Sequence, residues 1–190
     1  MKTRTKALLV SICAILLVVT TVFVTMAFLT SKTGDVVNTF TIGDVKITLD
    51  EAKVNNMGEK DGTDRVTANS YKLIPGHSYI KDPTVHVDAN SENCWIFVKV
   101  ENGLKDIIDT KTIEAQMAEK GWTLVAGQTN VYAYKDVVSA NANVVVFDDF
   151  KLKGDANVAN YANASIKITA YAIQADGFDS SAAAAAELTF

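Results

Sequence analysis

An alternation of apolar residues with a period of two restricts the fold of this chain more than any other feature. In the segment "CWIFVKVE" at residues 94–101, every second side chain is apolar and falls on one face: Cys94, Ile96, Val98 and Val100. Successive side chains of a strand point to opposite faces, so this pattern predicts a strand with one face in a core. The other face begins with Trp95 and Phe97, and we expect either the inserted helix predicted below at residues 110–120 or another subunit to cover them.

Several further segments repeat this pattern and are separated by polar turns such as Pro75-Gly76. One amphipathic helix is predicted from Thr110 to Lys120, with Gly121 ending it. A short C-terminal helix is predicted in "DSSAAAAAEL", with Asp179 or Ser180 as its N-cap. The remaining strands are predicted in residues 45–50, 79–87, 123–125, 131–135, 144–152 and 165–173.

The polar, glycine-containing segment "NNMGEKDGTDRVTAN" at residues 55–69 predicts a loop or the tip of a hairpin. A parallel α/β fold would need a helix between most strands, and this chain offers too few. We therefore predict a mainly β protein: an antiparallel, jelly-roll-like β-sandwich with one inserted short helix and a short C-terminal helix.

The N-terminus has the features of an export signal. Lys2, Arg4 and Lys6 precede residues 7–29, which carry no charge. Thr25 and Ala27 place small side chains at positions −3 and −1 of a cut before Phe28. We predict that residues 1–27 are a cleaved signal peptide, and an uncleaved membrane anchor is the alternative. Residues 28–40 then form an N-terminal extension, residues 41–190 form the β-sandwich domain, and the mature chain is secreted.

Charge excludes one class of partner. Removing residues 1–27 lowers the Lys and Arg count from 18 to 15 and leaves the 22 acidic residues, so the net charge becomes −7. Such a surface repels nucleic acid. Cys94 is the one cysteine outside the predicted signal, so no disulfide framework is expected.

The sequence offers few catalytic residues. His77 follows the Pro75-Gly76 turn and His86 lies in a predicted strand, so we expect both to face solvent rather than bind a metal. Cys94 is predicted to be a small buried residue rather than a nucleophile. The acidic pairs are interpreted as solvated surface groups: Asp148 with Asp149, Asp61 with Asp64, and Asp176 with Asp179. We therefore predict no catalytic residue, no cofactor and no metal.

The order of the segments resembles a known family. The predicted signal runs into "FLTSKTGDVVNTFTIGDVKITLDEAKV", followed by "KLIPGHSYIKDPTVHVDANSENCWIFVKV", "GWTLVAGQTNVYAY", "VVVFDDFKL" and "NASIKITAYAIQADGF". These segments, which span nearly the whole chain, are similar to those of the TasA/camelysin family of Gram-positive biofilm-matrix and cell-surface proteins. The features that carry the resemblance are Asn38-Thr39-Phe40, Pro75-Gly76 with Lys81 and Pro83 beyond it, and the closing segment 170–175.

This resemblance implies a jelly-roll subunit that assembles head to tail into an extracellular fibre after processing by a SipW-type signal peptidase. An accessory or anchoring matrix protein is a further partner that it suggests. In such fibres the segment behind the cleavage site completes a sheet of the next subunit, which is donor-strand complementation. The candidate donor residues here are Phe28, Leu29, Val36, Val37 and Phe40.

Two alternatives belong to other functional classes. Camelysin-like members are described as metalloproteases, so the resemblance also implies a surface protease, although this chain has two histidines and no zinc-binding motif. An uncleaved N-terminal segment would instead make the chain a monomeric, membrane-anchored surface adhesin. The N-terminal residue of the secreted protein distinguishes the fibre subunit from the anchored adhesin.

Overall fold

The computed structural model describes Ile12 and residues 43–190, and residues 43–190 belong to one compact unit. The predicted cleavage site and the candidate donor segment 28–40 lie outside the described residues. Among the residues that are described, no helix has both the length and the apolar character needed to cross a bilayer.

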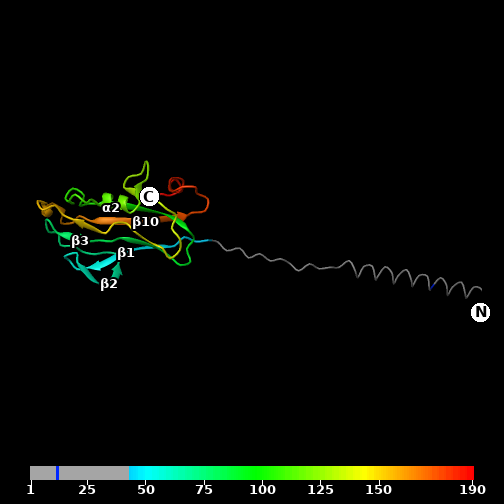
Figure 1. The fold of residues 1–190 in the computed structure, drawn as a ribbon, viewed down its shortest axis with the longest axis horizontal. Coiled ribbons are helices and arrows are strands. Elements are labelled where there is room, and N and C mark those ends of the chain that lie inside the picture. Colours follow the sequence, from blue (N-terminus) through cyan, green and yellow to red (C-terminus); the bar gives the residue numbers. More distant parts are fainter. Residues whose placement is uncertain (1–11, 13–42) are drawn as a thin grey trace, which may run out of the picture. The chain divides into compact units, whose positions relative to one another are not determined.

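Two four-stranded antiparallel sheets form the body of the domain (Figure 1). The first sheet has the order β2-β1-β4-β8. Its register places Ile47 opposite Val87 and Leu49 opposite Val85, so the apolar residues of neighbouring strands share one face. The strands are β1 (Ile47–Val54), β2 (Lys60–Val66), β4 (Thr84–Val87) and β8 (Asn143–Val145).

The second sheet has the order β10-β5-β7-β6. Its two long strands, β5 and β10, pair without a break from Ile166 opposite Asn102 to Gln174 opposite Cys94. The alternation of residues 94–101 favours this pairing, because the inward residues Ile96, Val98 and Val100 each meet an apolar residue across the ladder. The strands are β5 (Cys94–Asn102), β6 (Trp122–Leu124), β7 (Val131–Tyr134) and β10 (Ile166–Gln174).

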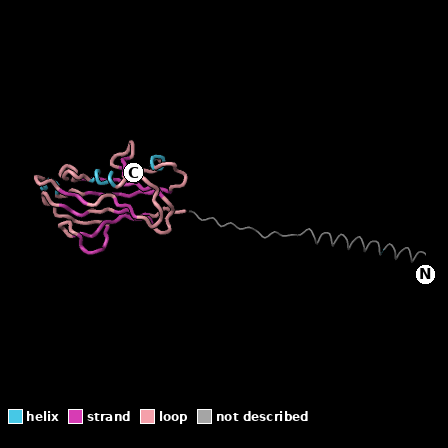
Figure 2. Tube along the Cα trace, in the orientation of Figure 1, coloured by secondary structure: helices cyan, strands magenta, loops and turns pink. Residues whose placement is uncertain are grey.

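Smaller elements complete the fold, as the colouring by secondary structure in Figure 2 shows. A two-stranded antiparallel sheet joins β3 (Ser78–Ile80) to β9 (Asp149–Lys151). The helical elements are α2 (Ile113–Glu119), the 3-10 helix η1 (Val158–Tyr161) and α3 (Ser181–Ala185). The predicted mainly β fold with one inserted and one C-terminal helix is therefore confirmed.

The main core lies between the two sheets and includes α2. Its largest fully buried side chains are Tyr79, Ile96, Ile113, Met117, Phe147 and Phe150. A second, smaller cluster covers the opposite face of the β10-β5-β7-β6 sheet, where Phe97 packs with Ala184 and Ala185 of α3, and Trp95 lies at its margin. The helix that covers Trp95 and Phe97 is thus the C-terminal one, and the expectation of cover by the inserted helix is wrong.

The structure corrects two details of the sequence analysis. Residues 55–59 form the tip of a hairpin, as predicted, but residues 60–66 form its second strand β2, which pairs with β1 through contacts such as Ala52 opposite Arg65. The inserted helix begins at Ile113 rather than Thr110, since the hydroxyl of Thr112 accepts a hydrogen bond from the backbone N–H of Ala115. Gly121 ends the helix as predicted, with a φ of 91°.

Candidate strand-binding groove

One lateral side of the sandwich is open in the part of the chain that the structure describes. Strand β10 pairs with β5 along one edge, and no described strand pairs with its other edge. In the facing sheet, the first half of β1 pairs with β4, whereas β2 joins β1 from Glu51 onward. The free edge of β10 and the free edge of residues 47–50 lie on the same side of the domain, because residues 49–51 and residues 166–168 line one hollow.

Burial shows the consequence of this open side. In β5 the inward residues Ile96 and Val98 are 0% exposed, whereas their partners on β10, Ala172 and Ala170, remain half-buried. The same asymmetry occurs in the other sheet: Val85 and Val87 of β4 are buried, and their partners on β1 are half-buried. The half-buried apolar residues that line this side are Val45, Ile47, Leu49, Ile166, Ile168, Ala170 and Ala172.

Three hollows follow β10 along this side and together define what we call the lateral groove. One, of about 390 Å³, lies between residues 49–51 of β1 and residues 166–168 of β10. A second, of about 240 Å³, extends past Ile166 toward Tyr71 and Tyr161. The third, of about 540 Å³, lies between residues 44–45 and residues 172–174. The lateral groove therefore consists of hollows at the two ends of β10, at residues 166–168 and 172–174, with the half-buried Ala170 between them.

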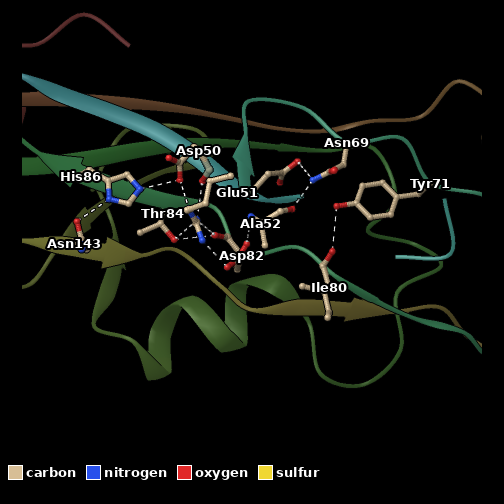
Figure 3. A network of polar contacts seen from close by, with 11 residues as sticks. Asp50, Glu51, Ala52, Asn69, Tyr71, Ile80, Asp82, Thr84, His86 and Asn143 are labelled. Atoms are coloured by element: carbon tan, nitrogen blue, oxygen red, sulfur yellow. Dashed lines mark hydrogen bonds and ion pairs between the residues drawn. The ribbon is translucent and has the colours of Figure 1, made fainter. Parts of the chain in front are cut away.

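A buried ion pair lies beside the first two hollows. Glu51 and Lys81 are 5% and 7% exposed, and their side-chain atoms Oε2 and Nζ are 2.5 Å apart. The amide Nδ2 of Asn69 donates to Oε1 of the same carboxylate over 3.0 Å (Figure 3). Tyr71 lies next to this ion pair, with its ring centroid 6.0 Å from Nζ of Lys81. Burial is the main cause that raises the pKa of Tyr71, and the negative charge of Glu51 raises it further.

A polar network lies on the outer face of the β2-β1-β4-β8 sheet. In it, Arg65 of β2 contacts β1, the residues just before β4 and the first residue of β4. Its guanidinium donates to the Asp50 carboxylate over 2.5 Å, to the Asp82 carboxylate over 3.0 Å and to the Thr84 hydroxyl over 2.9 Å. Asp82 in turn accepts the backbone N–H of Ala52 over 2.6 Å. Arg65 therefore fastens β2 to β1 and to the start of β4.

His86 extends this network. Figure 3 shows its ring between Asp50 and Asn143, and the ring nitrogens lie 2.8 Å from Oδ1 of Asp50 and 2.7 Å from Oδ1 of Asn143. His77 lies elsewhere: its Nε2 is 2.8 Å from the carbonyl oxygen of Met57. The expectation that both histidines simply face solvent is therefore wrong, because each is half-buried and bonded to the protein.

The remaining candidate residues, Cys94 and the acidic residues, make contacts that stabilise the fold and show no catalytic arrangement. Cys94 is 0% exposed, as predicted, and burial raises the pKa of its thiol, so the reactive thiolate is disfavoured. Asp148 pairs with Lys120 over 2.9 Å, and Asp61 pairs with Lys53 over 3.3 Å. Within the described residues, no group of three or more His, Cys, Asp and Glu side chains is placed to hold a metal ion.

The contacts of Asp50 predict a loss of stability in acid. Partial burial acts to raise the pKa of Asp50, but hydrogen bonds and charges from Arg65 and His86 outweigh it and hold this pKa below its usual value. A lowered folded-state pKa adds stability above the unfolded-state pKa, and this stability is lost as the pH falls through the folded value. We expect the free energy of unfolding, measured with urea, to fall more steeply below about pH 4 in the wild type than in Asp50→Asn.

Asp44→Asn is the control for this measurement, because Asp44 pairs at the surface with Lys46 over 3.1 Å. Its acid profile should follow that of the wild type. Equal acid profiles for the wild type and Asp50→Asn would contradict the assigned role of the network.

Sequence reasoning missed the charged residues beside the groove, although a signal for Glu51 was present. The alternation of Ile47 and Leu49 continues to Glu51, which places a carboxylate on the inward face and requires a cationic partner there. Nothing in the local pattern identifies that partner as Lys81, because the two residues are 30 positions apart.

Comparison of the chain with protein-family models, with curated proteins and with solved structures gives no match.

Proposed function

We propose that this chain is a secreted structural subunit of an extracellular fibre at the cell surface or in a biofilm matrix. Residues 28–40 of one copy would occupy the lateral groove of the next copy. The observation that carries this proposal is the matched pair of half-buried apolar rows, one on β10 and one on β1, beside edges that pair with no described strand. One added strand would cover both rows and satisfy the free backbone groups of β10.

The length and composition of the candidate donor segment suit this groove. The nine residues of β10 span about 30 Å at roughly 3.3 Å per residue, and a segment of 13 residues can reach about 43 Å. The segment contains no proline that would interrupt a ladder of hydrogen bonds. In an extended conformation Phe28, Val36 and Phe40 share one face with Thr30, Lys32 and Asn38, so Val36 and Phe40 at its C-terminal end would supply most of the apolar contact.

Binding of the donor segment of one copy by the next copy would explain how the fibre grows and what starts its assembly. A donor on one copy and a groove on the next form a heterologous contact, which continues into a filament unless it closes as a ring. A chain still held by its apolar leader could not offer the donor segment, so cleavage before Phe28 by a SipW-type signal peptidase would start assembly. An accessory matrix protein with a similar free segment could begin or anchor the fibre.

The experiment that tests this function compares residues 28–190 with residues 39–190. We expect the longer chain to form fibres that are visible by negative-stain electron microscopy. The shorter chain should remain a folded monomer, with unchanged far-ultraviolet circular dichroism and a monomeric mass by light scattering. A synthetic peptide of residues 28–40 should bind the shorter chain one to one and slow amide hydrogen exchange in β10.

A matched peptide carrying Val36→Asp and Phe40→Asp serves as the control, and we expect it not to bind. Fibres of normal appearance from residues 39–190 would refute the donor-segment proposal. A monomeric form of residues 28–190 with protected β10 amides would place the segment in its own groove, and would also refute polymerisation. Cell-associated protein that still begins at Met1 would favour the membrane-anchored adhesin.

A further inference from the structure

A primary amine and a carboxamide share one buried carboxylate beside the lateral groove. Oε2 of Glu51 lies 2.5 Å from Nζ of Lys81, and Oε1 accepts from Nδ2 of Asn69 over 3.0 Å. Lys81 belongs to the connection between β3 and β4, and Asn69 follows the end of β2. An ion pair buried to this degree adds little to stability, because the cost of removing two charges from water offsets their attraction.

The hydrogen bonds of Asn69 orient its side-chain carboxamide so that a nucleophile could attack its carbonyl carbon. Its Oδ1 accepts the backbone N–H of Val54 over 3.0 Å, and its Nδ2 also donates to the carbonyl oxygen of Ala52 over 2.9 Å. The N–H of Val54 therefore points at the oxygen on which negative charge develops when a nucleophile attacks the amide carbon. The nitrogen that would leave faces Oε1 of Glu51, which can deliver a proton to it.

We propose that Lys81 and Asn69 become joined by an intramolecular amide bond, with Glu51 carrying protons between the two nitrogens. Oε2 of Glu51 first takes a proton from the Nζ ammonium, which frees the lone pair of the amine. Nζ then attacks Cγ of Asn69, and the N–C bond forms while the negative charge on Oδ1 rests against the N–H of Val54. Glu51 next passes a proton to Nδ2 and accepts one from Nζ.

The C–N bond to Nδ2 then breaks, and the departing ammonia takes the remaining proton from Glu51 and leaves as ammonium. The atoms balance: one ammonium and one carboxamide give one secondary amide and one ammonium ion, with no change of oxidation state. Glu51 returns to its carboxylate form, and the reaction needs no metal, cofactor or second protein.

The position of the three groups favours this reaction over hydrolysis. Glu51 and Lys81 are nearly inaccessible to water, and the two oxygens of one carboxylate hold the amine and the carboxamide, which replaces a collision in solution with a rearrangement inside the protein. Asn69 and Lys81 both line the first two hollows of the lateral groove, so the bond would fasten two segments of its wall. The bond would form within a single subunit and does not require polymerisation.

Mass spectrometry of the full chain under denaturing conditions tests the proposal. The protein is expected to be lighter than its sequence by one ammonia, about 17 Da. Trypsin cleaves after Arg65, Lys72 and Lys99 but not after an acylated lysine, so the bond should appear as residues 66–72 joined to residues 73–99. Lys81→Arg, Asn69→Ala and Glu51→Gln should each restore the unmodified mass, with circular dichroism confirming that each variant is folded.

Asn69→Asp separates the proposed chemistry from a merely structural contact. This variant begins about 1 Da heavier, loses water instead of ammonia, and should reach the same final mass as the wild type. A wild-type protein at its full sequence mass would overturn the proposal without the need for any variant. An equal mass loss without the branched peptide, as a succinimide at Asn102-Gly103 would produce, would also overturn it.

Discussion

Replacing Ile168 with glutamate is expected to abolish fibre assembly while leaving the subunit folded. Ile168 is half-buried on β10, lies opposite Val100 and lines the hollow of about 390 Å³. In the free subunit the new carboxylate can reach water through the open groove, so the cost to folding should stay near 1 kcal/mol. In the fibre the donor segment would seal that route and leave the charge without a partner.

The cost to assembly should therefore be several kcal/mol. Even about 3 kcal/mol raises the protein concentration needed for assembly by more than about 100-fold. Sedimentation of residues 28–190 over a range of concentrations, together with negative-stain imaging, measures this change.

Thr169→Glu is the matched control, because it places the same side chain one residue further along β10. Thr169 lies on the other face of the sheet and pairs with Lys99, which offers the new carboxylate an opposite charge. This variant should form fibres at the wild-type concentration. Equal assembly by both variants would show that the groove face of β10 does not contact a neighbouring subunit.

The sequence predicted the fold class because the relevant signals are local. The period of two in residues 94–101 determines which side chains of β5 face the core, and Cys94, Ile96 and Val98 are all 0% exposed. The C-terminal helix was equally accessible, since Ser180 accepts from the backbone N–H of Ala183 as a capping residue should. Patterns that depend on neighbours in the chain are visible without a structure.

Pairing between distant segments explains what the sequence could not predict. Strand β2 has six of its seven residues exposed, so it carries no apolar alternation, and its strand conformation comes from pairing with β1 and from the contacts of Arg65. The lateral groove is likewise invisible in the sequence. The sequence of β10 does not distinguish its apolar residues from those of a fully buried strand. They are half-buried because β10 is the edge strand of its sheet.

Gly58→Ala is expected to destabilise the domain by about 3 kcal/mol or more, through two effects that act together. Gly58 has a φ of 75°, a conformation that costs an L-residue about 1–2 kcal/mol. A Cβ at this position would also lie 2.6 Å from Cδ1 and 2.9 Å from Cα of Tyr79. Overpacking of this kind costs about 1–3 kcal/mol in addition.

Tyr79 cannot easily move away from this Cβ. It is 0% exposed and stacks on Phe150 with ring centroids 4.9 Å apart, and its hydroxyl accepts from the backbone N–H of Ile74 and donates to the carbonyl oxygen of Lys72. The neighbouring residue is also held, because the N–H of Ile80 donates to the carbonyl oxygen of Gly58 over 2.9 Å. The backbone around Tyr79 would therefore have to shift, and with it the pairing of β3 with β9.

Gly62→Ala isolates the steric part of this effect. Gly62 has a similar φ of 83°, but a Cβ added there would have no atom within 4 Å, so its cost should be the backbone strain of about 1–2 kcal/mol. Urea unfolding of the two variants measures both costs against the wild type. Equal losses would mean that Tyr79 moves to accommodate the added methyl group. The β3–β9 region would then be more deformable than the full burial and the two hydroxyl hydrogen bonds of Tyr79 imply.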